Sequence, residues 1–367
     1  MTILVFVLIS LHGLIHLLGF LKAFRLAKAG QFTQDISKPA GALWLLCAVM
    51  FTLAGALFLL RAPAWCWVAA PAVLISQALI FTSWTDARFG SLANLVLLVV
   101  LIPALAQTLP GSFPSMFRAA AERGLQRIAP DSTLAEADLA ALPAPVQKYM
   151  RLSGAVGKPR VRSVHAVFSG TFRRDPTSPW MKIAAEQYNF FGPPERLFLI
   201  RASQFGIPFA SLHVFSTGCA TMQVRVASLF QVVDARGPKM DQGETVTFFN
   251  DMCVLAPATL IAPNIRWEPV DDLTARAAFT NEGITVRAEL KFNQAGELVS
   301  FSSGDRFLSA DGRTYWRLPW ITPLGDYREF GGRRVAGEGE AIWLTPQGPL
   351  PYGKFHLERI EYNSAPK

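Results

Sequence analysis

The amino-acid sequence predicts a bundle of four membrane-spanning helices followed by an antiparallel, nearly all-β domain with one inserted helix. Hydrophobic residues make up 51% of the 367 residues and charged residues only 17%, whereas about 25% charged is usual in soluble proteins. Almost all of the apolar excess lies before Pro110. From about Val161 the hydrophobic pattern changes to a period of two, which is typical of strands with one buried face.

Four apolar segments occupy the N-terminal region, and each is close to the ~20 residues that a helix needs to cross a bilayer. They run over residues 3–21, 40–60, 65–84 and 92–109, and none contains Lys, Arg, Asp or Glu. Because backbone groups in lipid must be paired internally, these segments are expected to be helices. The short connections between them predict an antiparallel four-helix transmembrane domain over residues 1–110.

Basic residues in the first loop predict the orientation. Lys22, Arg25, Lys28 and Lys38 follow the first apolar segment, and an excess of positive residues marks cytoplasmic loops. The C-terminal domain is then extracytoplasmic, in a multi-pass protein of the inner (plasma) membrane. No Lys or Arg precedes the first segment, which argues against a cleaved signal peptide. The net charge of +8 is scattered, so the lipid bilayer rather than nucleic acid is the expected partner.

Residues 111–153 are predicted to be a helical linker. A helix over residues 114–128 has one apolar and one basic face, which is typical of a helix lying on anionic lipid. A plain connector helix explains the pattern equally well. A second helix is expected in APVQKYMRLSG, with Pro145 near its start and Gly154 at its end. The apolar face of the first helix consists of Phe117, Ala121, Gly124, Leu125 and Ile128.

Alternating side chains predict an antiparallel β-rich domain over residues 154–367. The clearest strand is ITVRAELKF, residues 284–292, in which apolar and polar residues alternate. NQAG and then ELVSF follow it, which indicates a hairpin. Similar β-rich runs are VHAVFSGTF, RLFLIR, MQVRV, EAIWL and KFHLERIEY.

One helix is expected to interrupt these strands. Asp241 and Glu244 have the spacing of a capping box at its start, and Pro257 lies just past its last turn. An apolar helix among strands with one apolar face each is expected to lie in the curve of the sheet. The candidate residues for binding an apolar ligand there are Phe248, Phe249, Met252, Leu255 and Trp267.

Five segments are distinctive as a set: HGLIHLLGF, SWTDARFGSLANLVLLV, LPAPVQKYMRLSG, IRWEPVDDLTARAAF and GEAIWLTPQGPLPYGKFHLERIEYN. Together they resemble a family of uncharacterised bacterial membrane proteins, defined as a domain of unknown function, over most of the chain. This resemblance implies no activity. The β pattern is also similar to that of half-barrel lipoprotein carriers, which hold acyl chains between a curved sheet and lid helices. That second resemblance implies a half-barrel-like domain that binds a lipid-like hydrophobic ligand.

Two histidines lie inside the first apolar segment. His12 and His16 share one helical face, and ionisable groups within a membrane are functional candidates by default. A metal site needs more ligands, and the other three apolar segments contain no His, Asp or Glu. The favoured interpretation is polar packing, with Gly13 and Gly19 allowing close helix contact. A proton or ligand role and a metal site stay open. The expected hydrogen-bond partners of the histidines are Ser76, Gln77 and Asn94.

No catalytic residue, metal or cofactor is predicted. The chain lacks CxxC, HExxH, GxSxG and a glycine-rich phosphate loop. His213 could form a triad with a residue of FSTGCAT and Asp271 or Asp272, a combination that arises by chance in most chains of this size. Cys219 and Cys253 could pair in an exported domain, but two buried free thiols are favoured.

Three functions remain. The favoured one is a membrane-anchored carrier or sensor with a lipid-like ligand in the β domain, which an empty apolar cavity would support. The second is a non-enzymatic assembly or interaction module, which a filled core and an exposed apolar patch would support. The third is a hydrolase, which would need His213 hydrogen-bonded to an acid in a polar cleft. Asp305 beside Arg306 is interpreted as a local ion pair or turn.

Overall fold

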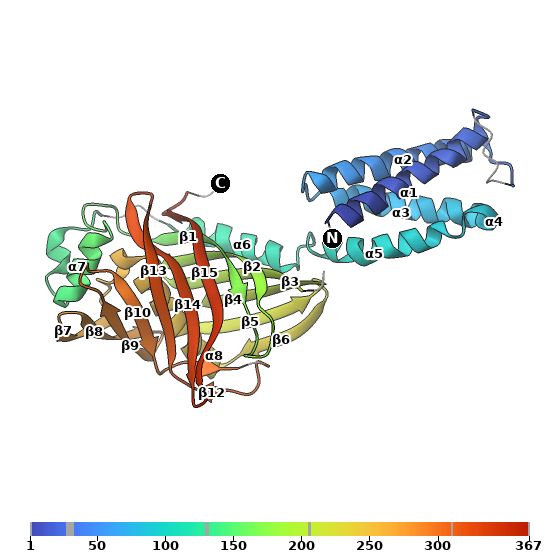
Figure 1. The fold of residues 1–367 in the computed structure, drawn as a ribbon. Helices are drawn as coiled ribbons and strands as arrows, with labels where there is room; N and C mark the ends of the chain where they lie inside the picture. The colour runs from blue at the N-terminus through green and yellow to red at the C-terminus, as the bar shows by residue number, and fades with distance from the viewer. Residues whose placement is uncertain (1, 27–32, 129–131, 205–206, 310, 366–367) are drawn as a thin grey trace. The chain divides into compact units, whose positions relative to one another are not determined.

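The computed structural model describes residues 2–26, 33–128, 132–204, 207–309 and 311–365, and Lys28 of the orientation argument lies outside them (Figure 1). The chain divides into two compact units, Met1–Ser112 and Phe113–Lys367.

The first unit is helical. Its helices are α1 (Thr2–Ala23), α2 (Lys38–Leu59), α3 (Trp65–Thr82), α4 (Trp84–Ala87) and α5 (Gly90–Ala106). In the described part of the chain, α1, α2 and α3 are long and apolar enough to cross a membrane. The apolar helix α5 has only 17 residues, so four spans are not confirmed.

Small residues bring α1 and α2 together, as expected. A Cβ added at Gly13 would lie 2.8 Å from the Cβ of Phe51, and one added at Gly19 would overlap the ring of Trp44. Larger side chains at these two positions would therefore push the helices apart.

The second unit is built on one antiparallel sheet of 13 strands. The first group of strands is β1 (Ser163–Phe172), β2 (Met181–Phe191), β3 (Pro194–Gln204), β4 (Ile207–Ser216), β5 (Cys219–Val226) and β6 (Phe230–Arg236). The second group is β7 (Ile265–Asp271), β8 (Thr274–Asn281), β9 (Ile284–Phe292), β10 (Leu298–Ser303), β13 (Trp320–Phe330), β14 (Arg333–Thr345) and β15 (Gly348–Tyr362).

The two groups join through β1 and β15, where Val164 lies opposite Tyr362. The strand order is β6-β5-β4-β3-β2-β1-β15-β14-β13-β10-β9-β8-β7. Because β6 and β7 stand at its two ends, the sheet is open rather than a closed barrel. A separate small ribbon is formed by β11 (Phe307–Leu308) and β12 (Trp316–Arg317). The hairpin predicted from ITVRAELKF and ELVSF is confirmed as β9 and β10, and β8 pairs with the other edge of β9.

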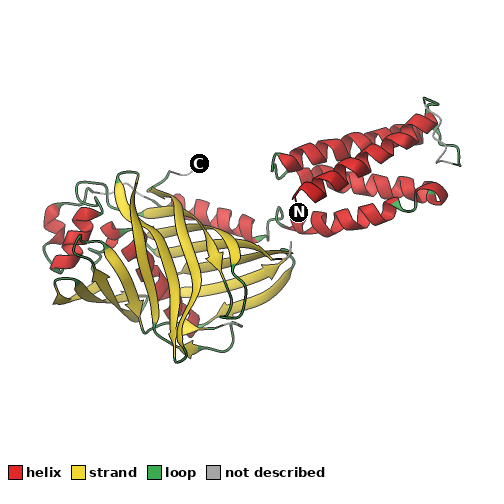
Figure 2. Cartoon of the chain, in the orientation of Figure 1, coloured by secondary structure: helices red, strands yellow, loops and turns green. Residues whose placement is uncertain are grey.

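The inserted helix α8 (Pro238–Leu255) lies in the curve of the sheet (Figures 1 and 2). It begins three residues before Asp241 because Pro238 occupies its first turn, where a missing N–H costs nothing. The predicted capping box is therefore wrong. The Asp241 carboxylate instead accepts a hydrogen bond from the backbone N–H of Ala220, at 2.7 Å, and Glu244 is buried inside the unit.

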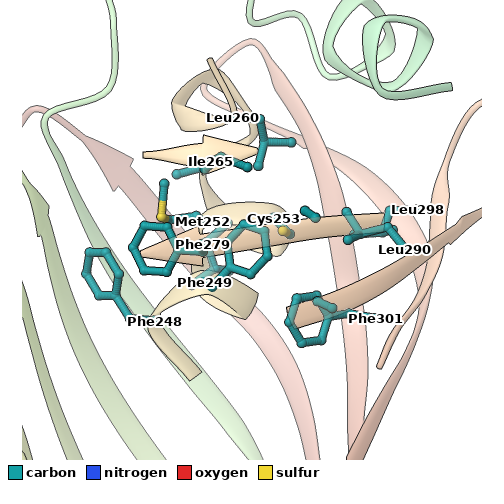
Figure 3. Packing of buried hydrophobic residues seen from close by; sticks show 14 of the residues in the cluster. Phe248, Phe249, Met252, Cys253, Leu260, Ile265, Phe279, Leu290, Leu298 and Phe301 are labelled. Carbon is teal, nitrogen blue, oxygen red and sulfur yellow. The ribbon is translucent and has the colours of Figure 1, made fainter. Parts of the chain in front are cut away.

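One side of α8 packs into the main hydrophobic core (Figure 3). The rings of Phe249 and Phe279 stack with their centroids 5.2 Å apart. The ring centroids of Phe248 and Phe215 lie 5.8 Å apart. Met252 belongs to the same cluster. This side of the helix is closed by side chains of the sheet.

Of the segment 111–153 that is predicted as a linker, the described residues from Phe113 on belong to the second unit. Helix α6 (Phe113–Leu125) lies on β3 and β4, where its apolar face meets Leu197, Leu199 and Leu212. Its apolar face is thus covered by protein, as in the connector interpretation, and is not free to lie on lipid. Helix α7 (Ala144–Leu152) ends just before Gly154, whose φ of 65° is the left-handed stop that the sequence predicts.

Tyrosines hold the C-terminal end of α8. The last carbonyl groups of a helix have no partner within it. Tyr149 of α7 donates a hydrogen bond to the carbonyl of Cys253, and Tyr362 of β15 donates to that of Leu255, both at 2.9 Å. The four cysteines are free; Cys253 is buried as expected, but Cys219 is exposed.

Candidate ligand-binding site

A cavity of about 1210 Å³ lies between α8 and the inner face of the sheet. This volume exceeds the range of about 300–1,000 Å³ that is usual for ligand pockets. Strands β1–β6 and β13–β15 contribute to its wall, together with one face of α8. Apolar side chains that line it include Phe198, Ile200, Phe209, Met222, Leu324 and Leu350.

Strand β3 shows how the wall is built. Successive side chains of a strand point to opposite faces of the sheet. Phe198 and Ile200 line the cavity, whereas the alternate residues Leu197 and Leu199 pack under α6. Because both faces of this strand are covered, its sequence RLFLIR reads as a continuous apolar run without clear alternation.

The cavity is lined by the face of α8 opposite the predicted one. Of the five predicted ligand-binding residues, Leu255 lines the cavity, whereas Phe248, Phe249 and Met252 are at most 3% exposed and belong to the closed core. Trp267 is half-buried and donates from Nε1 to the carbonyl of Leu260 at 3.2 Å. Ligand binding by these residues stays a prediction.

The cavity face of α8 is largely polar. Its residues recur every three or four positions, which places them on one side of a helix. The sequence contains this signal, since polar residues at helical spacing lie between the apolar residues of α8 that pack in the core. Residues of this face that line the cavity are Gly243, Glu244, Thr247, Asn250, Asp251 and Val254.

A buried charge cluster lies on this face. Arg196 donates from Nε to Asp251 Oδ2 at 2.7 Å and from Nη1 to Glu244 Oε2 at 3.2 Å. The side-chain amides of Gln187 and Asn189 donate to the same Asp251 oxygen at 2.8 and 3.0 Å. All five residues are at most 8% exposed. Sequence reasoning missed this cluster.

The environment of Glu244 keeps it ionised. Burial opposes the charged form, but the positive charge of Arg196, aided by His213 and Arg306, outweighs burial and lowers the carboxyl pKa from 4.5 to about 2. Burial raises the pKa of Asp251 above its ordinary value, and Arg196 offsets part of this effect. Three N–H donors converge on one Asp251 oxygen, an arrangement that fits a carboxylate.

Arg306 supplies a second cation to the cavity wall. Its guanidinium packs over the ring of Trp320, 4.3 Å from the centroid. It donates to the hydroxyl of Tyr352 at 3.1 Å and to the carbonyl of Gly243 at 3.3 Å. Its Nη2 lies 3.8 Å from Glu244 Oε1.

The residues of the hydrolase hypothesis are not arranged as a triad. His213 lines the cavity, but its Nδ1 lies 3.8 Å from Glu244 Oε1, longer than a hydrogen bond. No other described residue accepts a hydrogen bond from this nitrogen. Asp271 is the last residue of β7 and Asp272 lies in the turn after it, both exposed, and Cys219 is exposed at the start of β5.

In the first unit, His12 and His16 join a buried polar network. His12 Nε2 lies 2.9 Å from Asn94 Oδ1, and His16 Nε2 lies 2.9 Å from Ser76 Oγ. The Asn94 amide also donates to Gln77 Oε1 at 3.1 Å. These contacts link α1 with α3 and α5, which is the geometry of the packing interpretation.

If the histidines are packing groups, replacing either one should have a small effect. We expect His12→Gln or His16→Asn to lower the free energy of unfolding by about 1 kcal/mol at most, the scale of interhelical hydrogen bonds in membranes. Thermal unfolding in detergent measures this loss, and elemental analysis should find the metal content unchanged. Stoichiometric zinc, or a haem Soret band, that disappears in either variant would contradict the packing role.

A model for a family of unknown function, DUF6544, matches residues 132–355, which include α7, α8 and most of the sheet. The chain belongs to this family. The matched region contains all the residues of α8 that line the cavity. No curated protein matches the chain.

Several solved structures are similar to part of this chain at 10–11% sequence identity. A LolA superfamily protein from Nitrosomonas europaea is 10% identical, with 62% of this chain and 96% of that chain covered and a TM-score of 0.35. A DUF1329 family protein from Desulfovibrio piger is 10% identical, with 60% and 92% covered and a TM-score of 0.34. A domain assigned to outer membrane lipoprotein sorting, from Vibrio parahaemolyticus, is 11% identical, with 55% and 85% covered and a TM-score of 0.32. Because these TM-scores are below 0.5, the similarities do not bear on the function.

Proposed function

We propose that this protein binds a lipid-like hydrophobic ligand in the cavity between α8 and the sheet, which acts as a half-barrel. The main support is a cavity of about 1210 Å³ with apolar side chains on its wall. Protein interiors are normally close-packed, because side chains that line a void lose their dispersion contacts. A chain that keeps so large a volume free of its own side chains is suited to hold an apolar guest there.

The other two functions fit this geometry less well. An interaction module needs no cavity, although the edge strand β6 does expose apolar residues such as Phe230 and Val232. A hydrolase needs His213 hydrogen-bonded to an acid, and the 3.8 Å separation from Glu244 does not provide that bond.

Binding of an acyl-chain fluorescent probe tests the proposed function. The full-length protein, held in amphipol, is titrated with the probe. We expect saturable binding with one site per chain. If the probe gives only a linear, non-saturable signal, the proposed function is wrong.

We also propose that the first unit anchors the protein in the inner membrane of a bacterium through four helices, including α5. The 17 residues of α5 stand at the lower end of the range of about 17–25 that can span a bilayer. The basic residues Lys22, Arg25 and Lys38 favour a cytoplasmic first loop. With an even number of spans, the N-terminus and the second unit are both extracytoplasmic.

Reporter fusions test this topology. An alkaline phosphatase, which is active only after export, should be active when fused after Lys367 and inactive when fused in the first loop near Gln31. Three spans instead of four would place the second unit in the cytoplasm and leave the C-terminal fusion inactive. The reverse pattern at both sites would overturn the orientation.

A further inference from the structure

The polar part of the cavity narrows the class of ligand. We propose that the ligand has an uncharged, hydrogen-bonding head group, such as the hydroxyl and ester groups of an acylglycerol, and not a carboxylate, phosphate or amine. This inference rests on the proposed function, since it needs a ligand in the cavity. The relevant surface, here called the polar floor, consists of Gln187, Arg196, His213, Glu244, Asp251 and Arg306, all of which line the cavity.

Charges on the polar floor already match one another. Two guanidinium groups, Arg196 and Arg306, face two carboxylates, Glu244 and Asp251. Every one of these groups has an opposite charge within 3.8 Å. The charges of these four groups sum to zero. A buried charge without a partner is strongly unfavourable, so a charged head group would enter a site with no unmatched counter-charge.

The charges at the rim of the cavity are balanced too, and their side chains are exposed to solvent. Its exposed charged residues comprise three bases and three acids, whose interactions with a ligand are screened by water. Glu340, which is half-buried, is paired with Lys354 at 3.5 Å. The rim therefore gives no clear preference for either charge. The exposed charged residues are Arg174, Lys239, Arg313, Asp234, Asp311 and Glu338.

Neutral polar atoms in the cavity wall lack partners. Asn250 and Thr322 line the cavity and are 7% and 8% exposed, yet Asn250 Nδ2 and Thr322 Oγ1 have no hydrogen-bond partner among the described residues. The same holds for Ser211 Oγ, also in the cavity wall. Buried polar atoms are nearly always hydrogen-bonded, so such exceptions call for a missing partner.

Uncharged oxygen groups supply the missing partners without adding charge. An ester carbonyl can accept a hydrogen bond from the amide of Asn250, and a hydroxyl can both donate to and accept from Thr322 or Ser211. An alkyl chain attached to such a head group would occupy the apolar wall around Phe198 and Ile200. The cavity therefore matches a neutral amphiphile in both of its parts.

Competition between ligands of equal chain length tests the inference. The acyl-chain probe bound to full-length protein in amphipol at pH 8 is displaced by a monoacylglycerol, a fatty acid or an alkylamine. We expect the monoacylglycerol to displace the probe at a concentration at least about tenfold lower than either charged competitor. If the probe binds saturably but the fatty acid or the amine displaces it at the same or a lower concentration than the monoacylglycerol, the inference is wrong and the proposed function stands. If the probe does not bind, both are wrong.

Two variants test whether the polar groups of Asn250 and Thr322 produce the preference for an uncharged head group. Asn250→Leu and Thr322→Val remove an unpartnered polar group at similar volume, and each should reduce the preference for the monoacylglycerol by about three- to tenfold. Displacement by the fatty acid should not change. Thr285→Val, at an exposed site on β9 outside the cavity, is the control. If both cavity variants keep the wild-type preference, or weaken all competitors equally, the assignment is overturned.

Discussion

Replacing Arg196 with methionine is expected to lower the free energy of unfolding of the second unit by about 3–5 kcal/mol. The reason is that Glu244 and Asp251 would stay buried without the cation that contacts both of them. Labelling of the Cys253 thiol, which is fully buried, measures the opening of this unit. The rate at which this thiol reacts in the full-length protein should rise by more than 100-fold, about the factor that 3 kcal/mol represents.

Two further variants show whether burial of charge is the cause. Arg201 is exposed on the same strand, so Arg201→Met should change the free energy of unfolding by no more than about 0.5 kcal/mol. Adding Asp251→Asn to Arg196→Met should recover most of the lost stability, because Glu244 keeps Arg306 as its partner and no buried carboxylate is left unpaired. Equal labelling rates for the Arg196 and Arg201 variants would contradict a structural role for the cluster.

A second large effect is expected when the cavity is filled. Val254 lies on the cavity face of α8, and Val254→Phe should place a ring in the space that the ligand needs. We expect loss of acyl-probe binding with little change in the melting temperature of ligand-free protein. Phe249→Trp is the matched control on the same helix. It faces the closed core, where overpacking costs about 1–3 kcal/mol.

The two variants separate a cavity from a packed core. The account predicts that Phe249→Trp lowers the melting temperature and that its residual folded fraction still binds the probe. If Val254→Phe and Phe249→Trp destabilise the protein equally, the helix is packed on both sides. The interaction module would then be the better interpretation.

Most of the strands could be predicted from local patterns, because the alternation of residues within a strand depends on which of its faces is buried. Residues 284–292 alternate in the sequence and form β9 with one buried face. Alternation predicts β3 less clearly, because α6 covers one of its faces and the cavity lies on the other. Covering by a distant element is not visible in a strand's own pattern.

Polar pairing was the least predictable feature because the partners are far apart along the chain. Arg196 and Asp251 are separated by 55 positions, and neither has a local motif. The sequence suggests a local ion pair or turn where Asp305 stands next to Arg306, and in the structure Asp305 is paired with Arg317. Arg306 instead faces Glu244 in the cavity. A sequence shows which residues are polar, whereas their partners depend on how the sheet curves around α8.

Native mass spectrometry of the full-length protein shows directly whether a lipid-like ligand occupies the cavity. Wild type and Val254→Phe are purified in parallel. The lipid that remains bound is released, and its mass and its amount per protein chain are measured. We expect about one acyl-chain molecule per chain in wild type and none in the variant, with equal amounts of non-specifically bound lipid on both. The same lipid content in the two proteins, or no bound lipid in wild type, would contradict a ligand in the cavity.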